Sequence, residues 1–537
     1  MASLPPVREE ALPLSSLLDS VTNTTIGHVL ADRARTFPDA PFIHFGDDTI
    51  TFGEMQRRAV RASAGMRAAG IGRGDRVAIA ASNTPEWLIA YYATARIGAI
   101  LVTLNVVYRE REFVYLLGQS GSKMLICDEE AGGFQFRPFL QELAPQIPTV
   151  ERIAYLGGHD DASWAALVEA GVPTDDAPEG DPNIAPDDPA VILYTSGTTG
   201  DPKGATLTHR SLLASAAMQA DRFHQTEKDV ILGVLPFNHV GGITCTAGAS
   251  LVAGGAIVLP ARFQPDLVVA AANKHPITIF CGVPTIYRML LASEAFAACD
   301  VSHARLCVVG GANLEPALAD EVTARFNGPR LANLYGLSES SGACIISPED
   351  DTLELVSTSI GTTLDGVEGR VVADDGTELP RGSVGELQIR GACVAAGYWD
   401  KPAETATTFG TDGWLSTGDV ATMSDDGHVA IIARKKEMYV RGGYNVYPAE
   451  IENLLVTDPN VAMAAVIGVG DETYGETGYA FVVPAPGTTV DTAALIAMCR
   501  KSLAEYKIPD TVEIVGALPM TPAGKIKKVA LVPSQSS

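Results

Sequence analysis

The chain has 537 residues, and a prior of roughly 150 residues per domain suggests about three or four structural units. Its formal net charge of -25 leaves no overall basic field, which argues against nucleic acid as the main partner. Its 8 cysteines are scattered without a C-x-x-C pair, and its first residues do not form a signal peptide. We therefore expect buried, reduced thiols in a cytoplasmic protein, in preference to a disulfide framework or a zinc site.

The first part of the chain alternates predicted helices and strands. Residues 23–46 are predicted as a helix and a strand, residues 51–82 as a longer helix, a glycine turn and a buried strand, and residues 86–105 as a helix and a strand again. Short apolar strands follow at 123–128 and 150–157. This alternation is typical of α/β architecture with a mostly parallel sheet.

Residues 230–261 contain no formally charged side chain, and the stretch is long enough to span a membrane. Pro236, Asn238, His239 and many glycines interrupt it, however. Buried strands and an inner helix therefore explain it better than a membrane span, and we expect no transmembrane segment.

The composition changes twice in the C-terminal half. Residues 369–391 combine short strands with "DDG" and "RG" turns, which indicates an antiparallel or barrel-like β unit. After Asp419 the sequence becomes locally basic and a final α/β segment begins. We therefore predict a large N-terminal domain over residues 1–433, with parallel sheets, helices and the β unit, and a small mobile C-terminal α/β domain over residues 434–537.

The stretch "YTSGTTGDPKG" at 194–204 follows an apolar strand and has little to bury. Successive backbone N–H groups and hydroxyls in such a turn can form an anion nest, and Lys203 adds a mobile cation. Polyphosphate is the natural ligand, although a merely flexible surface loop is the alternative. The spacing differs from that of a Walker-type P-loop.

This stretch resembles the signature loop of the adenylate-forming superfamily, which comprises acyl-CoA synthetases, luciferases and the adenylation domains of peptide synthetases. Further motifs follow in the order found in that family. They are "LPFNHVGG" at 235–242 (gate), "GGANL" at 310–314 and "YGLSES" at 335–340 (adenine), "STGD" at 416–419 (ribose), "ARKKEMYVRGGYNVYPAEIE" at 433–452 (hinge) and "PMTPAGKIKK" at 519–528 (terminal lysine). The resemblance spans roughly residues 25–530.

The resemblance implies roles for individual residues. Lys525, Glu339 and His239 would be catalytic, and Thr198 and Glu339 would bind Mg²⁺, which prefers hard oxygen ligands. Asp419 can accept two ribose hydrogen bonds, although on its own it could also be a capping residue. The residues implied to bind ATP or AMP are Thr195, Ser196, Gly197, Thr198, Thr199, Gly200, Lys203, Gly310, Gly311, Ala312, Tyr335, Gly336, Ser338, Asp419 and Arg434.

Two further regions gain a role from the resemblance. Lys436 would be the hinge of the C-terminal domain, and Gly442 and Gly443 would lie on the CoA path, with a strand-end turn as the alternative for Gly443. The acyl-pocket candidates are small and uncharged and suggest a roomy, mainly apolar site: Gly241, Gly242, Gly310, Ser341, Gly342 and Ala343. The sequence departs from the family pattern at Ser338, where Thr is more usual, and at Ala433, where Gly or Asp is usual.

The resemblance implies two half-reactions with ATP, Mg²⁺ and coenzyme A. A carboxylate and ATP form acyl-AMP and pyrophosphate, and the thiol of coenzyme A then displaces AMP. Asn238 stands where amino-acid adenylation usually places an Asp, so we expect a fatty, aryl or alicyclic acid. The alternatives are an acyl-AMP ligase that loads a carrier protein, a luciferase-like oxygenase and an idle nucleotide-binding protein.

The predicted partners are therefore a small carboxylic acid, ATP and CoA. The spacing from Pro519 to Lys525 also resembles sites that lysine acetyltransferases modify in this family, so such an enzyme is a possible partner at Lys525. A monomer and a homodimer are both compatible with the sequence.

Overall fold

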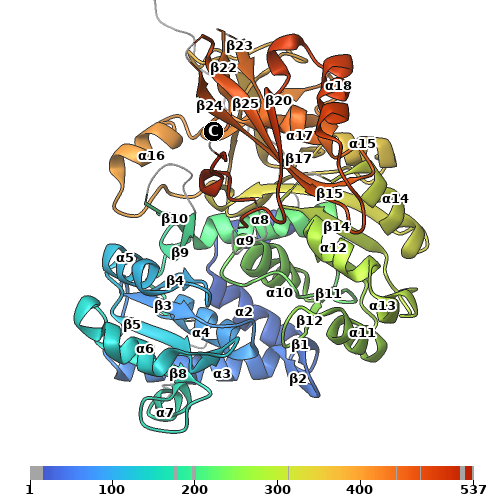
Figure 1. Ribbon diagram of the computed structural model, residues 1–537. Helices are drawn as coiled ribbons and strands as arrows, with labels where there is room; N and C mark the ends of the chain where they lie inside the picture. Colours follow the sequence, from blue (N-terminus) through green and yellow to red (C-terminus); the bar gives the residue numbers. More distant parts are fainter. Residues whose placement is uncertain are drawn as a thin grey trace, which may run out of the picture. The chain divides into compact units, whose positions relative to one another are not determined.

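The computed structural model describes residues 16–172, 180–195, 201–312, 314–442, 444–471, 473–520 and 526–534. It divides into two compact units (Figure 1). The first contains the N-terminal part of the chain with Asp201–Gly369 and Ile389–Leu415, and the second contains Arg370–Gln388 and the chain from Ser416 on. The second unit thus includes a β segment that precedes the boundary predicted at residue 434, and that boundary stays a prediction.

A six-stranded sheet occupies the first part of unit 1 (Figure 1). Its strand order is β10-β9-β4-β3-β5-β8, and all pairs are parallel except β10 with β9. The strands are β3 (Arg76–Ala80), β4 (Ile100–Leu104), β5 (Met124–Asp128), β8 (Arg152–Leu156), β9 (Pro189–Thr195) and β10 (Lys203–Thr208). The central strands are almost wholly buried, as expected for continuous apolar runs covered on both faces.

Three of the helices in this part of the chain were predicted: α2 (Ile26–Thr36), α3 (Phe52–Ala68) and α4 (Pro85–Arg96). Two others, α5 (Glu110–Ser120) and α6 (Phe136–Leu143), were not predicted. Helices α5 and α6 pack Phe113, Phe136 and their neighbours against the buried side chains of β3, β4 and β5. The predicted α/β architecture is confirmed for this region.

A nine-stranded sheet forms the rest of unit 1, in the order β17-β16-β15-β14-β13-β11-β12-β1-β2. The strands are β1 (Pro41–Phe45), β2 (Asp48–Thr51), β11 (Val230–Leu232), β12 (Ala256–Leu259), β13 (Ile279–Gly282), β14 (Leu306–Gly310), β15 (Arg330–Leu337), β16 (Gly342–Ile346) and β17 (Thr362–Thr363). The strands from β1 to β15 along the sheet pair in parallel, and the edge strands are antiparallel. One face is covered by α11 (Pro265–Lys274), α12 (Pro284–Leu291), α13 (Glu294–Ala297) and α14 (Pro316–Arg325).

The uncharged stretch at 230–261 folds as predicted, into two buried strands with helix between them. That helix consists of α9 (Val240–Gly242), a π-helical turn (Ile243–Gly248) and α10 (Ala249–Ala253), and it packs against α8 (His209–Arg222). A π-helical turn is rare and often occurs at a functional site. Among the described residues, no helix combines the length and apolarity that crossing a bilayer requires.

The second unit contains two sheets. The first has the order β18-β19-β20-β21 and is the β unit predicted from the sequence, with β18 (Val367–Val372), β19 (Gly385–Gly391), β20 (Leu415–Met423) and β21 (Val429–Arg434). The second has the order β23-β22-β25-β24, with β26 paired to β25. Its elements are β22 (Tyr439–Arg441), β23 (Tyr444–Val446), β24 (Val461–Asp471), β25 (Gly475–Pro484) and β26 (Thr511–Ile514), with helices α17 (Pro448–Leu455) and α18 (Thr492–Ser502).

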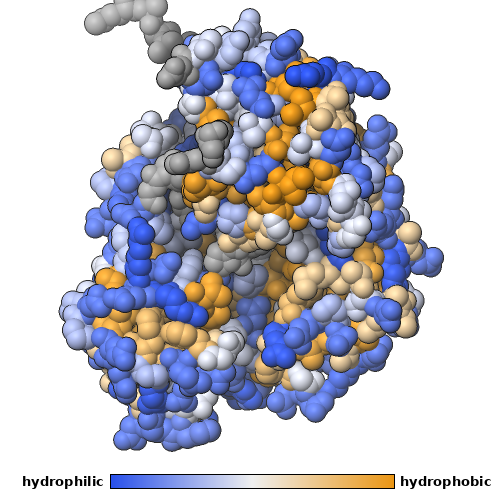
Figure 2. Space-filling view, viewed as in Figure 1, coloured by the Kyte–Doolittle hydropathy of each residue, from blue (hydrophilic) through white to orange (hydrophobic). Residues whose placement is uncertain are grey.

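The cysteines are buried, whereas several large apolar side chains are exposed, most of them in the second unit. All of the cysteines are free and buried, as the sequence analysis expected. Most of the exposed large apolar side chains belong to the second unit, where orange patches are visible in Figure 2. These residues are Val384, Val440, Tyr444, Tyr474, Ile514, Met520, Val529 and Val532.

Candidate active site

Lys203 and Glu339, two residues predicted from separate motifs, meet around Tyr398. Lys203 opens β10, and Glu339 lies in a short 3₁₀ turn directly after β15. The hydroxyl of Tyr398 donates to Oε1 of Glu339 at 2.7 Å, and Nζ of Lys203 lies 5.1 Å from the centroid of the tyrosine ring. The structure thus brings the predicted phosphate-binding lysine and the predicted metal-binding carboxylate together.

Backbone pairing sets the position of Tyr398. The segment 395–399 runs beside β10, where the amide of Thr206 donates to the carbonyl of Gly397 at 2.8 Å and the amide of Trp399 to that of Gly204 at 2.7 Å. Burial raises the pKa of the Tyr398 phenol, and the charge of Glu339 raises it further. The phenol therefore stays protonated and acts as a donor toward the carboxylate.

Tyr398 is a candidate site residue that the sequence analysis missed. It is separated from Glu339 by 59 positions, and nothing in the local sequence "AAGYWD" marks it as a partner of a carboxylate. Tyr398 could have been predicted only from the knowledge that segment 395–399 pairs with β10.

The two predicted adenine-binding segments lie at the ends of neighbouring parallel strands. Gly310, the last residue of β14, pairs in register with Leu334 of β15, and Tyr335 and Gly336 follow. A Cβ on Gly336 would lie 2.0 Å from the carbonyl oxygen of Gly342, so glycine is required for this approach to β16. The exposed Gly311 and Ala312 continue from β14 at the carboxyl edge of the sheet, where ligands of open α/β sheets bind.

Asp419 and Arg434 form an ion pair across a hairpin of the second unit. They are directly opposite each other on β20 and β21, and Nε of Arg434 lies 2.8 Å from Oδ1 of Asp419. The Asp419 side chain is 3% exposed and that of Arg434 is 43% exposed. Thr417 supports the same strand, because its hydroxyl accepts from the Asp419 amide and donates to the carbonyl of Leu387. The two predicted nucleotide-binding residues are therefore brought together as a charged pair.

The gate segment at 235–242 is held in place by Asn83, which the sequence analysis did not single out. The carboxamide of Asn83 donates to the carbonyl of Leu235 at 2.8 Å and accepts from the amide of Phe237 at 2.9 Å. His239 caps α9, because its Nδ1 accepts from the amide of Gly241 at 3.1 Å. A neutral His239 therefore carries its proton on Nε2.

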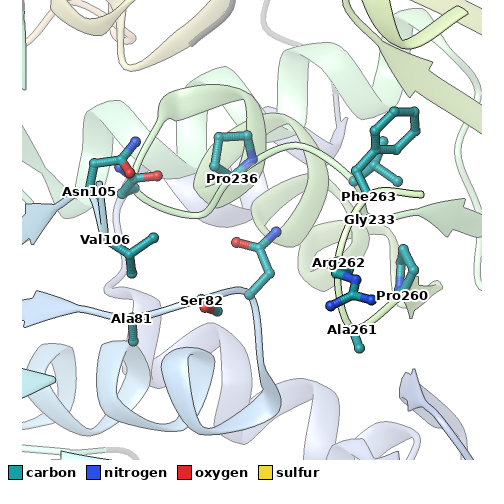
Figure 3. A pocket seen from close by; sticks show the side chains of 13 residues that line it. Ala81, Ser82, Asn105, Val106, Gly233, Pro236, Pro260, Ala261, Arg262 and Phe263 are labelled. Atoms are coloured by element: carbon teal, nitrogen blue, oxygen red, sulfur yellow. The ribbon is translucent and has the colours of Figure 1, made fainter. Parts of the chain in front are cut away.

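A cavity of about 190 Å³ opens beside this gate (Figure 3). Its walls come from the segments after β3, β4, β11 and β12, and they carry mainly small and polar side chains. The lining residues are Ala81, Ser82, Asn83, Asn105, Val106, Gly233, Val234, Pro236, Asn238, Pro260, Ala261, Arg262 and Phe263.

None of the predicted acyl-pocket residues lines this cavity. The hydroxyl of the fully buried Ser341 donates to that of Ser211 at 2.8 Å. A Cβ on Gly242 would lie 2.2 Å from the carbonyl oxygen of Pro236, and one on Gly342 would lie 2.6 Å from Oγ of Ser215. These glycines thus permit close packing, and Ala343 is buried beside them. The acyl-pocket role of all these residues, including Gly241, stays a prediction.

The remaining predicted residues divide into described and undescribed positions. Thr195 ends β9, Ser338 is buried, Lys436 is exposed in the turn between β21 and β22, and Gly442 has a φ of +57° in the turn between β22 and β23. The positions outside the described residues are Ser196, Gly197, Thr198, Thr199, Gly200, Gly443 and Lys525.

Comparison with known proteins assigns the family. The family of AMP-binding enzymes matches residues 30–399, and the C-terminal domain of AMP-binding enzymes matches residues 450–525. A feruloyl-CoA synthase of Amycolatopsis sp is 33% identical over 94% of this chain and 98% of its own length. A Mycobacterium tuberculosis protein named 3-[(3aS,4S,7aS)-7a-methyl-1,5-dioxo-octahydro-1H-inden-4-yl]propanoyl:CoA ligase is 35% identical over 94% of this chain and 98% of its own.

A solved structure gives the same answer for the fold. ATP-bound MatB from Rhodopseudomonas palustris has a TM-score of 0.84 and 30% sequence identity, and the match covers 94% of this chain and 98% of that one. The chain therefore belongs to the family of AMP-binding enzymes, within the adenylate-forming superfamily that contains the acyl-CoA synthetases.

Proposed function

We infer that this chain is an ATP-dependent carboxylic acid:CoA ligase that releases AMP and pyrophosphate. A carboxylate oxygen attacks the α-phosphorus of ATP, the bond from that phosphorus to pyrophosphate breaks, and acyl-AMP forms. The sulfur of CoA then attacks the acyl carbon, the thiol proton is lost, and AMP leaves. The observation that carries this proposal is the meeting of Lys203 and Glu339 around Tyr398.

The first half-reaction joins two anions, so the site must offset their repulsion. We propose that Lys203 approaches the ATP phosphates and that Lys525 bridges the attacking carboxylate and the α-phosphate. Asp419 would accept hydrogen bonds from the ribose hydroxyls, and Arg434 holds its carboxylate at 2.8 Å.

We propose that Glu339 and Thr198 hold Mg²⁺ together with the phosphates of ATP. Only Oε1 of Glu339 takes the bond from Tyr398, so the second oxygen can serve a cation. The described residues contain no group of three or more His, Cys, Asp or Glu side chains suited to a metal. This fits Mg²⁺, which usually binds through one or two protein carboxylates and the substrate phosphates. When bound, the ion would neutralise phosphate charge.

For the acyl group, we propose an aryl or alicyclic carboxylate, with a fatty acid as the further possibility. Two relatives that match nearly the whole chain are named for a feruloyl group and for a propanoyl group that carries a dioxo-octahydroindene ring system. Both groups are bulky ring systems on a short carboxylate arm. Screening CoA ligation across aromatic, alicyclic and fatty acids would test this, and exclusive use of acetate or malonate would contradict it.

We propose that the cavity beside the gate receives the pantetheine arm of CoA. Its lining combines the polar groups of Asn105, Asn238 and Arg262 with apolar side chains such as Val106 and Phe263, and a pantetheine arm likewise alternates amides with short alkyl segments. Replacing Asn105 by Trp should slow thioester formation from supplied acyl-AMP and leave pyrophosphate exchange near normal. Unchanged thioester formation would remove the cavity from the CoA path.

Lys525→Ala tests the assignment of the reaction. Loss of one preorganised charge contact of this type should lower carboxylate-dependent pyrophosphate exchange by about 10²–10³-fold. Thioester formation from synthetic acyl-AMP and CoA should persist, because that step does not use Lys525. Equal loss of both steps would contradict the assignment. Dependence on free CoA separates the ligase from an enzyme that loads a carrier protein.

Two features of its setting are also proposed. Lys525 is a candidate for enzymatic acetylation, which would remove its charge and stop adenylation. Acetylated protein with full activity would refute that proposal.

We place the enzyme in the cytoplasm, where ATP and CoA are available and its 8 free cysteines would stay reduced, and cell fractionation would test this.

A further inference from the structure

Lys528, three positions after Lys525, lies in a charged cluster of the second unit. Its Nζ is 2.5 Å from Oε2 of Glu437 and 2.7 Å from Oε1 of Glu452. The Lys528 and Glu452 side chains are 15% and 16% exposed, so most of the cluster is shielded from water. One ammonium group thus serves two carboxylates. We call these three residues the Lys528 cluster.

The charged forms of Lys528 and Glu452 depend on the ion pairs within the Lys528 cluster. Burial would by itself lower the pKa of Lys528, but the charges of Glu452 and Glu437 outweigh it and raise that pKa. Burial raises the pKa of Glu452, against the pull of Lys528 and of the Val466 amide, which donates to it at 2.6 Å. Removing one partner of a buried ion pair leaves an uncompensated charge and is strongly destabilising.

The chain on both sides of residues 521–525 is paired. Met520 and Ile526 form an antiparallel bridge, and the amide of Lys527 donates to the carbonyl of Pro519 at 2.7 Å. Ile526 also packs against the buried cluster that contains Tyr479, Phe481 and Leu518. Lys525 is therefore attached directly to an anchored residue, and the Lys528 cluster holds the chain that follows.

The two carboxylates come from different parts of the second unit. Glu437 lies in the turn after β21, directly beside Lys436, and its amide donates to the carbonyl of Arg434 at 3.0 Å. Glu452 lies on α17. Lys528 thus links the chain that carries Lys525 to the turn predicted as the hinge and to a packed helix.

We propose that Lys528 is a positioning residue that acts through Lys525: it fixes the end of the segment bearing Lys525 and couples that segment to the hinge turn. This inference rests on the proposed function, because it concerns the half-reaction that uses Lys525. Loss of the cluster would release the chain at Lys528, three positions after Lys525, from Glu437 and Glu452. Small misplacements of a catalytic group can lower a rate by about 10²-fold.

The test compares Lys528→Met with Lys527→Met. The control removes the same charge from the neighbouring lysine, which is exposed. In Lys528→Met, carboxylate-dependent pyrophosphate exchange should fall about 10- to 100-fold in kcat, with little change in KM for ATP. Thioester formation from synthetic acyl-AMP should stay near that of the unchanged protein. Hydrogen exchange of backbone amides at 516–531 should increase in Lys528→Met and not in Lys527→Met.

A second variant separates positioning from folding. The triple variant Lys528→Met, Glu437→Gln, Glu452→Gln removes the unpaired carboxylates, and it should show the same selective loss even where Lys528→Met does not fold. Adenylation near the unchanged rate in the folded variant would overturn the proposal. So would equal loss of both half-reactions, or an equal loss in Lys527→Met. Failure of the proposed function is a distinct result, because the unchanged protein itself would then lack one or both half-reactions.

Discussion

Two carboxylates that were predicted from separate motifs, one in each unit, are held in different ways. In the first unit, Glu339 accepts from a tyrosine hydroxyl, and the nearby cation Lys203 faces the ring of that tyrosine. In the second unit, Asp419 pairs directly with the guanidinium of Arg434. Among the described residues Glu339 has no ion-pair partner, so its carboxylate is available to a cation, whereas Asp419 is a buried carboxylate whose charge is balanced by Arg434.

This difference suggests a division of labour between the two carboxylates. A carboxylate that serves Mg²⁺ and the leaving pyrophosphate is needed in the first half-reaction only. A carboxylate that holds the ribose is needed in both half-reactions, because AMP stays bound until the thioester forms. The second unit also carries groups that we expect to serve a single half-reaction, such as Gly443.

Gly443→Leu should produce the largest effect and should affect the second half-reaction alone. The resemblance places this glycine on the CoA path, where a residue without Cβ leaves room for the thin pantetheine arm. We expect thioester formation from acyl-AMP to fall by about 10²-fold or more and pyrophosphate exchange to stay near normal. Lower stability with equal loss of both steps would instead indicate a turn glycine. Full thioester activity would remove Gly443 from the path.

Asp419→Ala should weaken both half-reactions, because the ribose is bound in both of them. Two ribose hydrogen bonds to a carboxylate are lost, each on the order of 1.5–3 kcal/mol, so we expect a loss of about 10²-fold or more. The measurements are KM for ATP, kcat for exchange, and the rate of thioester formation from acyl-AMP. Asp426→Ala, in the exposed turn of the same hairpin, is the matched control. Unchanged KM and kcat would show that Asp419 is a capping residue.

Tyr398→Phe should weaken the first half-reaction alone, and by less. It removes one hydrogen bond to a charged acceptor, worth about 1.5–3 kcal/mol, and part of that loss is recovered by water, so we expect about a tenfold effect. The readouts are the Mg²⁺ concentration needed for half-maximal exchange and the binding of Mg²⁺-ATP measured by calorimetry. Tyr155→Phe is the control, because that ring also lies near a cation, Arg137, at 4.2 Å. An equal loss in thioester formation would contradict the division of labour.

The smallest expected effect concerns the stability of the first unit in acid. Burial lowers the pKa of His209 from 6.5 to about 4, and Nε2 of this residue is buried without a hydrogen-bond partner among the described residues. The unfolded chain therefore binds the proton more strongly between these values, so the free energy of unfolding falls as the pH falls. We expect a loss of about 1 kcal/mol between roughly pH 6 and pH 5.

His209→Asn should remove that pH dependence, because the Asn side chain does not titrate. Its carboxamide oxygen can still accept from the Ile26 amide, which donates to Nδ1 of His209. Urea unfolding at the two pH values measures it, with the exposed His303→Asn as control. The same pH slope in His209→Asn as in the unchanged protein would contradict the assignment.

The sequence predicted several helices and strands of the first unit, because continuous apolar runs and helical periodicity are local properties, but it did not predict α5, α6 or the elements from α11 to β16. The alternating segments up to residue 157 and the buried stretch at 230–261 fold as expected. The motif resemblance identified the family and the reaction class, since motif order along the chain is also a property of the sequence.

Contacts between distant segments could not be predicted in this way. Asp419 and Arg434 face each other through hairpin register, which the turn sequence "SDDG" at 424–427 could have indicated. The partnership of Tyr398 with Glu339 depends on segment 395–399 lying beside β10, and the Lys528 cluster joins a turn, a helix and the chain end. The sequence by itself determined the types of element and the chemistry that they carry, because both depend on neighbouring residues. The tertiary structure decided which charges meet, because those distances depend on how separate segments pack.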